Sequence, residues 1–176
     1  MVEDVVRSLG YATLGSRLKR IGEKLQAQTQ ELTEVLAGTD LPTPHNPVLA
    51  ALDLHGPLSI GDLTRALGQS QPGVTRMVNR MKSDGLVEAR PDEKDGRVSR
   101  ISLTDAGTRL VAHLQSTLWP AAFIAVQDAC AALEGPLLDQ LAQLEDALAD
   151  KPLSRRKPDE PLPPWNTLSR APEKER

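Results

Sequence analysis

Cysteine, aromatic residues and long apolar runs are all scarce in this chain. Its 176 residues include one cysteine, Cys130, and only 2% Phe, Trp and Tyr. A single cysteine excludes a disulfide within the chain and is typical of a reducing compartment. With so few aromatic residues, the core must be built mainly from aliphatic side chains. No apolar run is long enough to span a membrane and no signal peptide is evident, so we expect a cytoplasmic protein with no membrane partner.

Residues that commonly carry catalysis or bind metals are also sparse. The three histidines, at positions 45, 55 and 113, do not cluster with Cys130 or with one another at ligand spacing, so we expect no metal site. A phosphate-binding glycine loop and a nucleophile elbow are both missing. We therefore expect no cofactor and no enzymatic activity. Cys130 lies among alanines without a basic neighbour, which favours a small buried apolar residue over an oxidant sensor.

Charge is unevenly distributed, although the net charge is only -3. Residues 70–100 contain seven basic and five acidic side chains, whereas residues 110–150 contain six acidic side chains and no Lys or Arg. This polarity would direct the middle of the chain toward a polyanion and keep the C-terminal part away from it.

The middle of the chain predicts two short helices joined by a tight turn. Ser59 can cap the first helix with Asp62 in the reciprocating third position, and Gly68 ends it. Ser70 can cap the second helix, with Pro72 in its first turn. In the second helix one face is apolar and predicted to be buried: Val74, Met77, Val78 and Met81. Its opposite face carries Arg, Asn and Thr but no acid, as a helix that reads DNA bases would.

A β-hairpin is predicted to follow the second helix. Residues 86–90 alternate between apolar and polar up to Pro91, and residues 97–103 alternate again with Ile101 and Leu103 on one face. The connection contains Asp95-Gly96, a strong turn signal. Two helices and a hairpin in this order predict a winged helix-turn-helix.

The hairpin also resembles a known family. Residues 95–100, Asp-Gly-Arg-Val-Ser-Arg, and Leu103-Thr104-Asp105-Ala106-Gly107 resemble the D-x-R-x-x-R and L-T-x-x-G motifs of MarR-type transcription regulators. The resemblance covers roughly residues 14–148. It implies a homodimer that binds a palindromic operator in double-stranded DNA, as a repressor released by a small ligand. It also implies that Asp95 and Arg100 form the scaffold of the wing, while Arg97 enters the minor groove.

From these patterns we expect Arg76 and Asn79 to read bases, and Arg80 and Lys82 to hold phosphates. The full predicted DNA-binding set is Ser70, Gln71, Pro72, Thr75, Arg76, Asn79, Arg80, Lys82, Lys94 and Arg97. A pocket for an effector is expected, by analogy of fold alone, to be lined by Tyr11, His45, His55 and Trp119. For both His45 and His55, a surface or satisfied histidine is the plainer interpretation.

Apolar stripes on both sides of the winged segment favour long dimerisation helices. Steps of four and three residues separate Leu14, Leu18, Ile21, Leu25, Gln28, Leu32 and Val35. After the hairpin, Thr104 can cap a long helix that Trp119-Pro120 should interrupt, and a last helix carries Leu137, Leu138, Leu141, Leu144 and Leu148. A short supporting helix is expected over Asn46–His55, capped by Asn46, with four buried residues: Val48, Leu49, Leu52 and Leu54.

The expected fold is therefore mainly α with a small β-wing. Residues 1–40 form an N-terminal dimerisation helix, 44–103 the DNA-binding domain, 104–150 the C-terminal dimerisation helices and 151–176 a disordered, Pro-rich charged tail. A sequence-specific DNA-binding regulator is the leading interpretation. A winged-helix module that contacts protein instead of DNA is the alternative, and a small enzyme of unknown class is a third.

Overall fold

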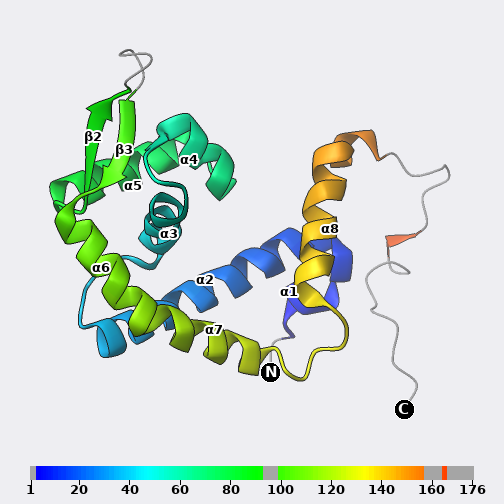
Figure 1. Cartoon of the computed structure of the whole chain (residues 1–176). Coiled ribbons are helices and arrows are strands. Elements are labelled where there is room, and N and C mark those ends of the chain that lie inside the picture. The colour runs from blue at the N-terminus through cyan, green and yellow to red at the C-terminus, as the bar shows by residue number, and fades with distance from the viewer. Residues whose placement is uncertain (1–2, 93–98, 157–163, 166–176) are drawn as a thin grey trace. The chain divides into compact units, whose positions relative to one another are not determined.

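The computed structural model describes residues 3–92, 99–156 and 164–165. These residues are mostly helical, with one three-stranded sheet, which confirms the predicted fold class (Figure 1). The chain divides into two compact units. One is Lys24–Val126, and the other combines Met1–Glu23 with Gln127–Arg176.

The first unit contains the winged helix-turn-helix. Its elements are α3 (Asn46–His55), β1 (Leu58–Ser59), α4 (Ile60–Leu67), α5 (Gln71–Ser83), β2 (Val87–Pro91), β3 (Ser99–Leu103) and α6 (Asp105–Ser116). The sheet has the order β1-β3-β2, and both pairings are antiparallel. Pro91 was expected to lie just beyond the strand. It is instead the last residue of β2 and pairs with Ser99. The sequence did not predict β1, because two residues are too few to show an alternating pattern.

The predicted ends of α4 are confirmed. Ser59 and Asp62 form a complete capping box, and Gly68 closes the helix at a left-handed φ of 60°. Such a φ is readily adopted by glycine, which has no Cβ. At α5, Ser70 has the extended backbone of an N-cap residue, but its side chain makes no capping hydrogen bond. Pro72 lies in the first turn of α5 and has no N–H, so the start of this helix has one fewer amide to satisfy.

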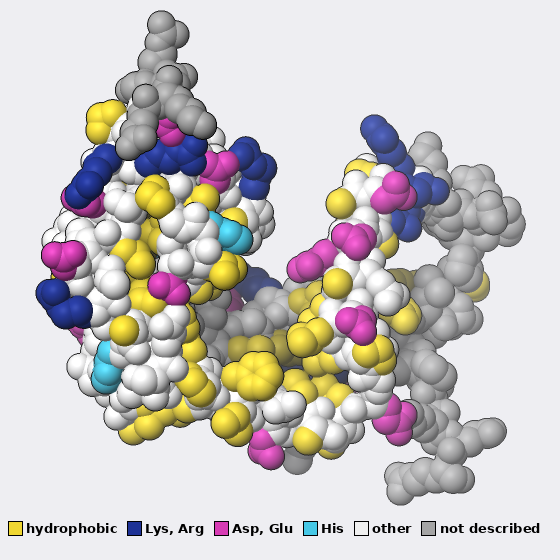
Figure 2. Space-filling model, in the orientation of Figure 1, with side chains coloured by type: hydrophobic (Ala, Val, Ile, Leu, Met, Phe, Trp, Pro, Cys, Tyr) yellow, Lys and Arg dark blue, Asp and Glu magenta, His cyan; other side chains and the backbone are white. Residues whose placement is uncertain are grey.

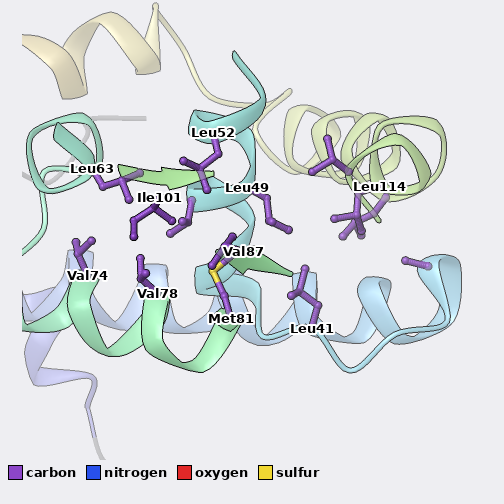
Figure 3. Packing of buried hydrophobic residues seen from close by; sticks show 14 residues of the cluster. Leu41, Leu49, Leu52, Leu63, Val74, Val78, Met81, Val87, Ile101 and Leu114 are labelled. Atoms are coloured by element: carbon purple, nitrogen blue, oxygen red, sulfur yellow. The ribbon is translucent and has the colours of Figure 1, made fainter. Parts of the chain in front are cut away.

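The core lies where α3, α4, α5, α6 and the sheet meet, as Figure 3 shows. Val74, Val78 and Met81 face inward as predicted, and Met77 is half-buried. The prediction for Leu54 was wrong, since 77% of this residue is exposed. The inward face of α3 follows a helical spacing of three and four residues, and Leu54 is two residues past its last member. The buried members of this face are Val48, Leu49 and Leu52.

Asn46 is not the cap of α3. His45, the last residue of the 3-10 turn η3 (Thr43–His45), occupies the N-cap position. Asn46 lies inside the first turn, where its Oδ1 accepts a hydrogen bond from the indole Nε1 of Trp119, at 2.9 Å. The side-chain oxygen of Asn46 therefore serves a contact 73 residues away along the chain, instead of a local cap.

The helices outside the winged segment expose apolar side chains. They are α1 (Val5–Ser8), α2 (Leu14–Leu32), α7 (Leu118–Ala129) and α8 (Leu137–Asp150), with 3-10 turns η1 (Gly10–Thr13) and η4 (Leu153–Arg155). A π-helical segment, η2 (Thr33–Ala37), extends α2 to Gly38. On α2, the stripe residues Leu18, Ile21 and Leu25 are exposed. Among the described residues, no helix has both the length and the apolar character needed to cross a membrane.

Helices α6 and α7 are separated at Thr117, whose φ of -126° and ψ of -70° are not helical. The break therefore comes three residues before Pro120. A proline ring clashes with the carbonyl four residues earlier, here that of Ser116, which accounts for the offset. The tail also departs from expectation at its start, because residues 153–155 form η4 and the Arg156 Nε donates to the Lys151 carbonyl at 2.7 Å. Residues 157–163 and 166–176, also expected to be disordered, lie outside the described part.

Candidate nucleic-acid interface

Helix α5 presents the predicted contact residues on its outer face. Arg76 and Asn79 are exposed, and neither side chain has a partner among the described residues. Thr75 is half-buried. The other candidates from α5 and its cap are exposed: Ser70, Gln71, Pro72, Arg80 and Lys82. No acidic residue occurs between Gln71 and Ser83. Guanidinium and carboxamide groups in this setting are available for hydrogen bonds to base edges.

Two of the candidates are already engaged within the helix. The Arg80 Nε donates to the Asp84 carboxylate, 3.0 Å away, so part of its charge is compensated. The Thr75 hydroxyl donates to the backbone carbonyl of Gln71, at 2.8 Å. Thr75 therefore has its methyl group and the two lone pairs of its oxygen to offer. Lys82 is the cation of this turn without an ion pair among the described residues.

The turn after α5 is fixed by the start of α6. The backbone N–H of Thr104 donates to the Leu86 carbonyl at 3.1 Å, and its hydroxyl donates to the Gly85 carbonyl at 2.7 Å. The same hydroxyl accepts from the N–H of Gly107, at 3.0 Å. A Cβ on Gly107 would lie 2.0 Å from the Leu86 oxygen, so only glycine permits this approach. These contacts give the L-T-x-x-G motif a physical role, holding the turn that follows α5 against the start of α6.

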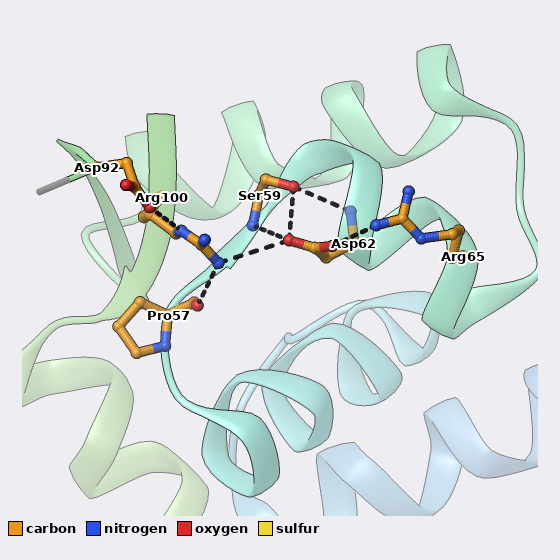
Figure 4. Close-up of polar contacts among 6 residues, drawn as sticks. All are labelled: Pro57, Ser59, Asp62, Arg65, Asp92 and Arg100. Atoms are coloured by element: carbon orange, nitrogen blue, oxygen red, sulfur yellow. Dashed lines mark hydrogen bonds and ion pairs between the residues drawn. The ribbon is translucent and has the colours of Figure 1, made fainter. Parts of the chain in front are cut away.

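The hairpin base is organised by Arg100, the second residue of β3 (Figure 4). Its Nε donates to the Asp92 carboxylate at 2.5 Å, and its Nη1 lies 3.6 Å from the Asp62 carboxylate and 3.4 Å from the Pro57 carbonyl. The hydrogen bond from Arg100 to Asp92 raises the pKa of the guanidinium. The expected pairing of Asp95 with Arg100 falls outside the described residues, as do Lys94 and Arg97.

Asp62, which the sequence indicated only as part of a helix cap, also forms an ion pair with Arg100 of the hairpin. Hydrogen bonds from the hydroxyl and the backbone N–H of Ser59 lower the pKa of the Asp62 carboxyl. Arg65 and Arg100 add attraction from two sides. On the face seen in Figure 2, Lys and Arg side chains gather around the base of the hairpin, with acidic side chains between them.

Of the four residues predicted to line an effector pocket, the three in the first unit, His45, His55 and Trp119, do not form one group. His45 is only 5% exposed, and its Nδ1 has no hydrogen-bond partner. Burial lowers the pKa of His45, with Asp84 opposing the shift and Arg80 adding to it. His45 immediately precedes Asn46 in sequence, and Trp119 donates a hydrogen bond to the Asn46 side chain. His45 and Trp119 are therefore linked through Asn46. His55 is exposed at the other end of α3, about 15 Å of helix away.

Tyr11 belongs to the other unit and is 94% exposed. A cavity of about 450 Å³ does occur in the winged segment, beside the hairpin. Its lining includes Pro57, Glu88, Arg90 and Arg100, and none of the four residues predicted for the effector pocket. Cys130, expected to be a small buried apolar residue, is only half-buried.

Residues 39–98 match the sequence profile of the MarR family. The chain is 33% identical over 87 residues to the HTH-type transcriptional repressor IacR of Pseudomonas putida. This match covers 49% of this chain and 52% of IacR. It is 35% identical over 78 residues to the transcriptional activatory protein BadR of Rhodopseudomonas palustris, which covers 43% of this chain and 45% of BadR. The chain thus spans about half the length of these curated relatives.

Solved structures share the fold at low identity. Bordetella bronchiseptica BpsR, whose DNA binding is regulated by 6-hydroxynicotinic acid, superposes with a TM-score of 0.62 at 24% identity, over 77% of this chain and 92% of BpsR. A mutant MarR of E. coli complexed with operator DNA superposes with a TM-score of 0.60 at 22% identity, over 78% of this chain and 91% of that MarR chain. At these identities the likeness establishes the arrangement of helices and wing, and nothing about ligand or operator.

Proposed function

We propose that this chain, whose residues 39–98 match the MarR family, is a sequence-specific DNA-binding transcription regulator of that family that works as a homodimer. In this proposal α5 enters the major groove, and the wing, through Arg97, enters the adjacent minor groove. Residues 44–103 form the DNA-binding domain, while residues 1–40 and 104–150 supply the dimerisation helices.

The observation that carries the proposal is the outer face of α5. Arg76 and Asn79 are exposed and unpaired among the described residues, on a helix without acidic side chains. The Thr104 hydroxyl also donates to the Gly85 carbonyl, which fixes the turn that follows this helix. Exposed guanidinium and carboxamide groups on one helix suit direct base readout, in which Arg pairs with guanine and Asn with adenine.

Dimerisation is supported by the apolar stripes that one chain leaves exposed. Leu18, Ile21 and Leu25 on α2 and Leu138, Leu141 and Leu148 on α8 are all exposed in the single chain. A two-fold dimer would cover such stripes and would present two copies of α5 about one helical turn of DNA apart. The operator would then be an inverted repeat with that spacing.

We further propose that the protein is a cytoplasmic repressor released by a small-molecule effector. IacR is a repressor by name, and the DNA binding of BpsR is regulated by 6-hydroxynicotinic acid. BadR is an activatory protein, so activation is the outcome that would correct the sign of regulation. No catalytic step and no cofactor enter this proposal.

Substitution of two pairs of residues on α5 tests the proposal. Arg76→Ala and Asn79→Ala should change which bases are preferred, with about 1–3 kcal/mol lost per bidentate contact. Arg80→Ala and Lys82→Ala should lower affinity about equally for all sequences and reduce the salt dependence of binding. Fluorescence anisotropy with a selected operator and a scrambled duplex, at several salt concentrations, measures both effects.

Two results would overturn the proposal. Equal losses from all four variants on both duplexes would remove base readout by α5. Absence of any salt-sensitive DNA binding by the intact chain would favour the alternative, a winged-helix module that contacts protein.

A further inference from the structure

One carboxylate links the first helix of the helix-turn-helix to the wing. The Oδ2 of Asp62 accepts from the Ser59 hydroxyl at 2.7 Å and from the Ser59 backbone N–H at 3.1 Å, which completes the cap of α4. The same oxygen lies 3.6 Å from the Arg100 Nη1. The position of the Arg100 side chain is therefore tied to the geometry of the α4 cap.

Arg100 connects three separate segments, as Figure 4 shows. Its guanidinium meets Asp92 at the end of β2, Asp62 in α4, and the carbonyl of Pro57 just before β1. Planar guanidinium groups have several donors in fixed directions, so one Arg can satisfy three acceptors at once. Lysine, with a single ammonium group on a flexible stem, cannot hold all three in one geometry.

The backbone gives the hairpin little attachment at this place. Strand β1 contributes only two residue pairs to β3, Leu58 with Ile101 and Ser59 with Arg100. Ser59 is also the cap residue of α4, so β1 and the cap share a residue. Side-chain contacts from Arg100 consequently add to a short ladder, at the point where the hairpin leaves the helical part of the domain.

We propose that Asp62 and Arg100 are positioning residues, which set the direction of the β2–β3 hairpin relative to α4 without themselves touching DNA. The proposal rests on the DNA binding proposed above, because a directed hairpin matters only if its tip has a target. It assigns Asp62 two roles, as the cap of α4 and as the anchor of the wing.

The test compares Arg100→Gln with Arg65→Gln, because each removes one positive charge that pairs with the Asp62 carboxylate. Arg65 is on α4 itself and has no described contact with the hairpin. Operator affinity should fall about fivefold for Arg100→Gln, as for the loss of a well-formed ion-pair network, and by less than about twofold for Arg65→Gln. Arg100→Lys should stay defective, because it restores charge but not the three directed contacts.

A double-mutant cycle identifies Asp62 as the partner. Asp62→Asn and Arg100→Gln should together cost less than the sum of their separate losses, since both remove the same contact. Ser59→Ala removes one of the hydrogen bonds to the Asp62 carboxylate but keeps its ion pair with Arg100, so it should cost less operator affinity than Asp62→Asn. Additive losses, or full rescue by Arg100→Lys, would overturn the proposal and leave Arg100 as a charge near DNA.

Amide hydrogen exchange of the DNA-free protein separates this proposal from the proposed function. In Arg100→Gln the peptides that cover residues 87–103 should exchange faster than in the wild type, while those of α4 and α6 should not change. Unchanged exchange in residues 87–103 overturns the positioning role even if DNA affinity falls. Faster exchange in a chain that binds no DNA supports the positioning role and refutes the proposed function instead.

Discussion

Replacing Gly107 by alanine should destabilise the winged segment without removing any side chain. Gly107 is the third residue of α6, and an added Cβ would lie 2.0 Å from the carbonyl oxygen of Leu86 and 3.4 Å from a methyl carbon of Leu103. Ordinary contacts between such atoms need about 3.5 Å. The start of α6 would therefore have to retreat by about 1 to 1.5 Å, because the obstacle is backbone and cannot rotate away.

That retreat would also strain the hydrogen bonds of Thr104 to Gly85 and Leu86, which now measure 2.7 and 3.1 Å. Overpacking a core typically costs about 1–3 kcal/mol, and each weakened hydrogen bond adds about 1 kcal/mol. We expect Gly107→Ala to lower the free energy of unfolding by about 3 kcal/mol. The loss of stability should be accompanied by weaker operator binding, because the contacts of Thr104 and Gly107 with Gly85 and Leu86 fix the turn that follows α5.

Urea unfolding at one fixed protein concentration measures the change, since an oligomer's stability depends on concentration. Gly61→Ala in α4 is the matched control. Its Cβ would lie 3.7 Å from the Ser59 Oγ and 3.8 Å from the Arg65 Nη1, which are ordinary contacts. That variant should be neutral or more stable by about 0.4–1 kcal/mol. Equal urea midpoints for the two variants would refute the proposed close approach of Gly107 to Leu86.

Four further outcomes are expected. Because burial lowers the pKa of His45 below its usual 6.5, the unfolded chain binds a proton at higher pH than the folded chain. The free energy of unfolding should therefore fall as the pH drops below about 6.5, level off below the folded pKa, and lose this slope in His45→Leu when both are followed by urea unfolding. Leu141→Glu should be monomeric at micromolar concentration by sedimentation and bind the operator more weakly; a dimeric variant would contradict the role of α8. Arg97→Ala should lose about 1–3 kcal/mol of operator affinity per wing while its circular dichroism stays unchanged, and equal affinity would refute the wing contact. Asp95→Ala should also weaken binding if it supports the wing, whereas tighter binding would mean that only its charge matters.

Local signals predicted the helix-turn-helix well. A cap such as Ser59 with Asp62, and a terminating Gly68, act over three or four residues, so the sequence carries them directly. The inward face of α5 was predicted for the same reason, because its spacing depends only on helix geometry.

Contacts between distant parts of the chain were not predictable in this way. Asn46 has the side chain of a helix cap, but its oxygen accepts from Trp119, 73 residues later. Asp62 was seen as a cap, and nothing within its own helix indicates Arg100, 38 residues away in sequence. Leu54 was expected in the core because it is apolar, although its position on α3 points elsewhere. Such outcomes depend on how elements pack, which a single sequence encodes only collectively.

Selection of bound sites from random duplex DNA tests the central claim most directly. The full chain should enrich one motif, an inverted repeat whose half-sites are centred about 10 base pairs apart, as two copies of α5 on one face of DNA require. The Arg76→Ala and Asn79→Ala variants should shift the preferred bases within each half-site while the spacing stays the same. Recovery of no enriched motif, or of a motif that is identical for the wild type and both variants, would contradict sequence readout by α5.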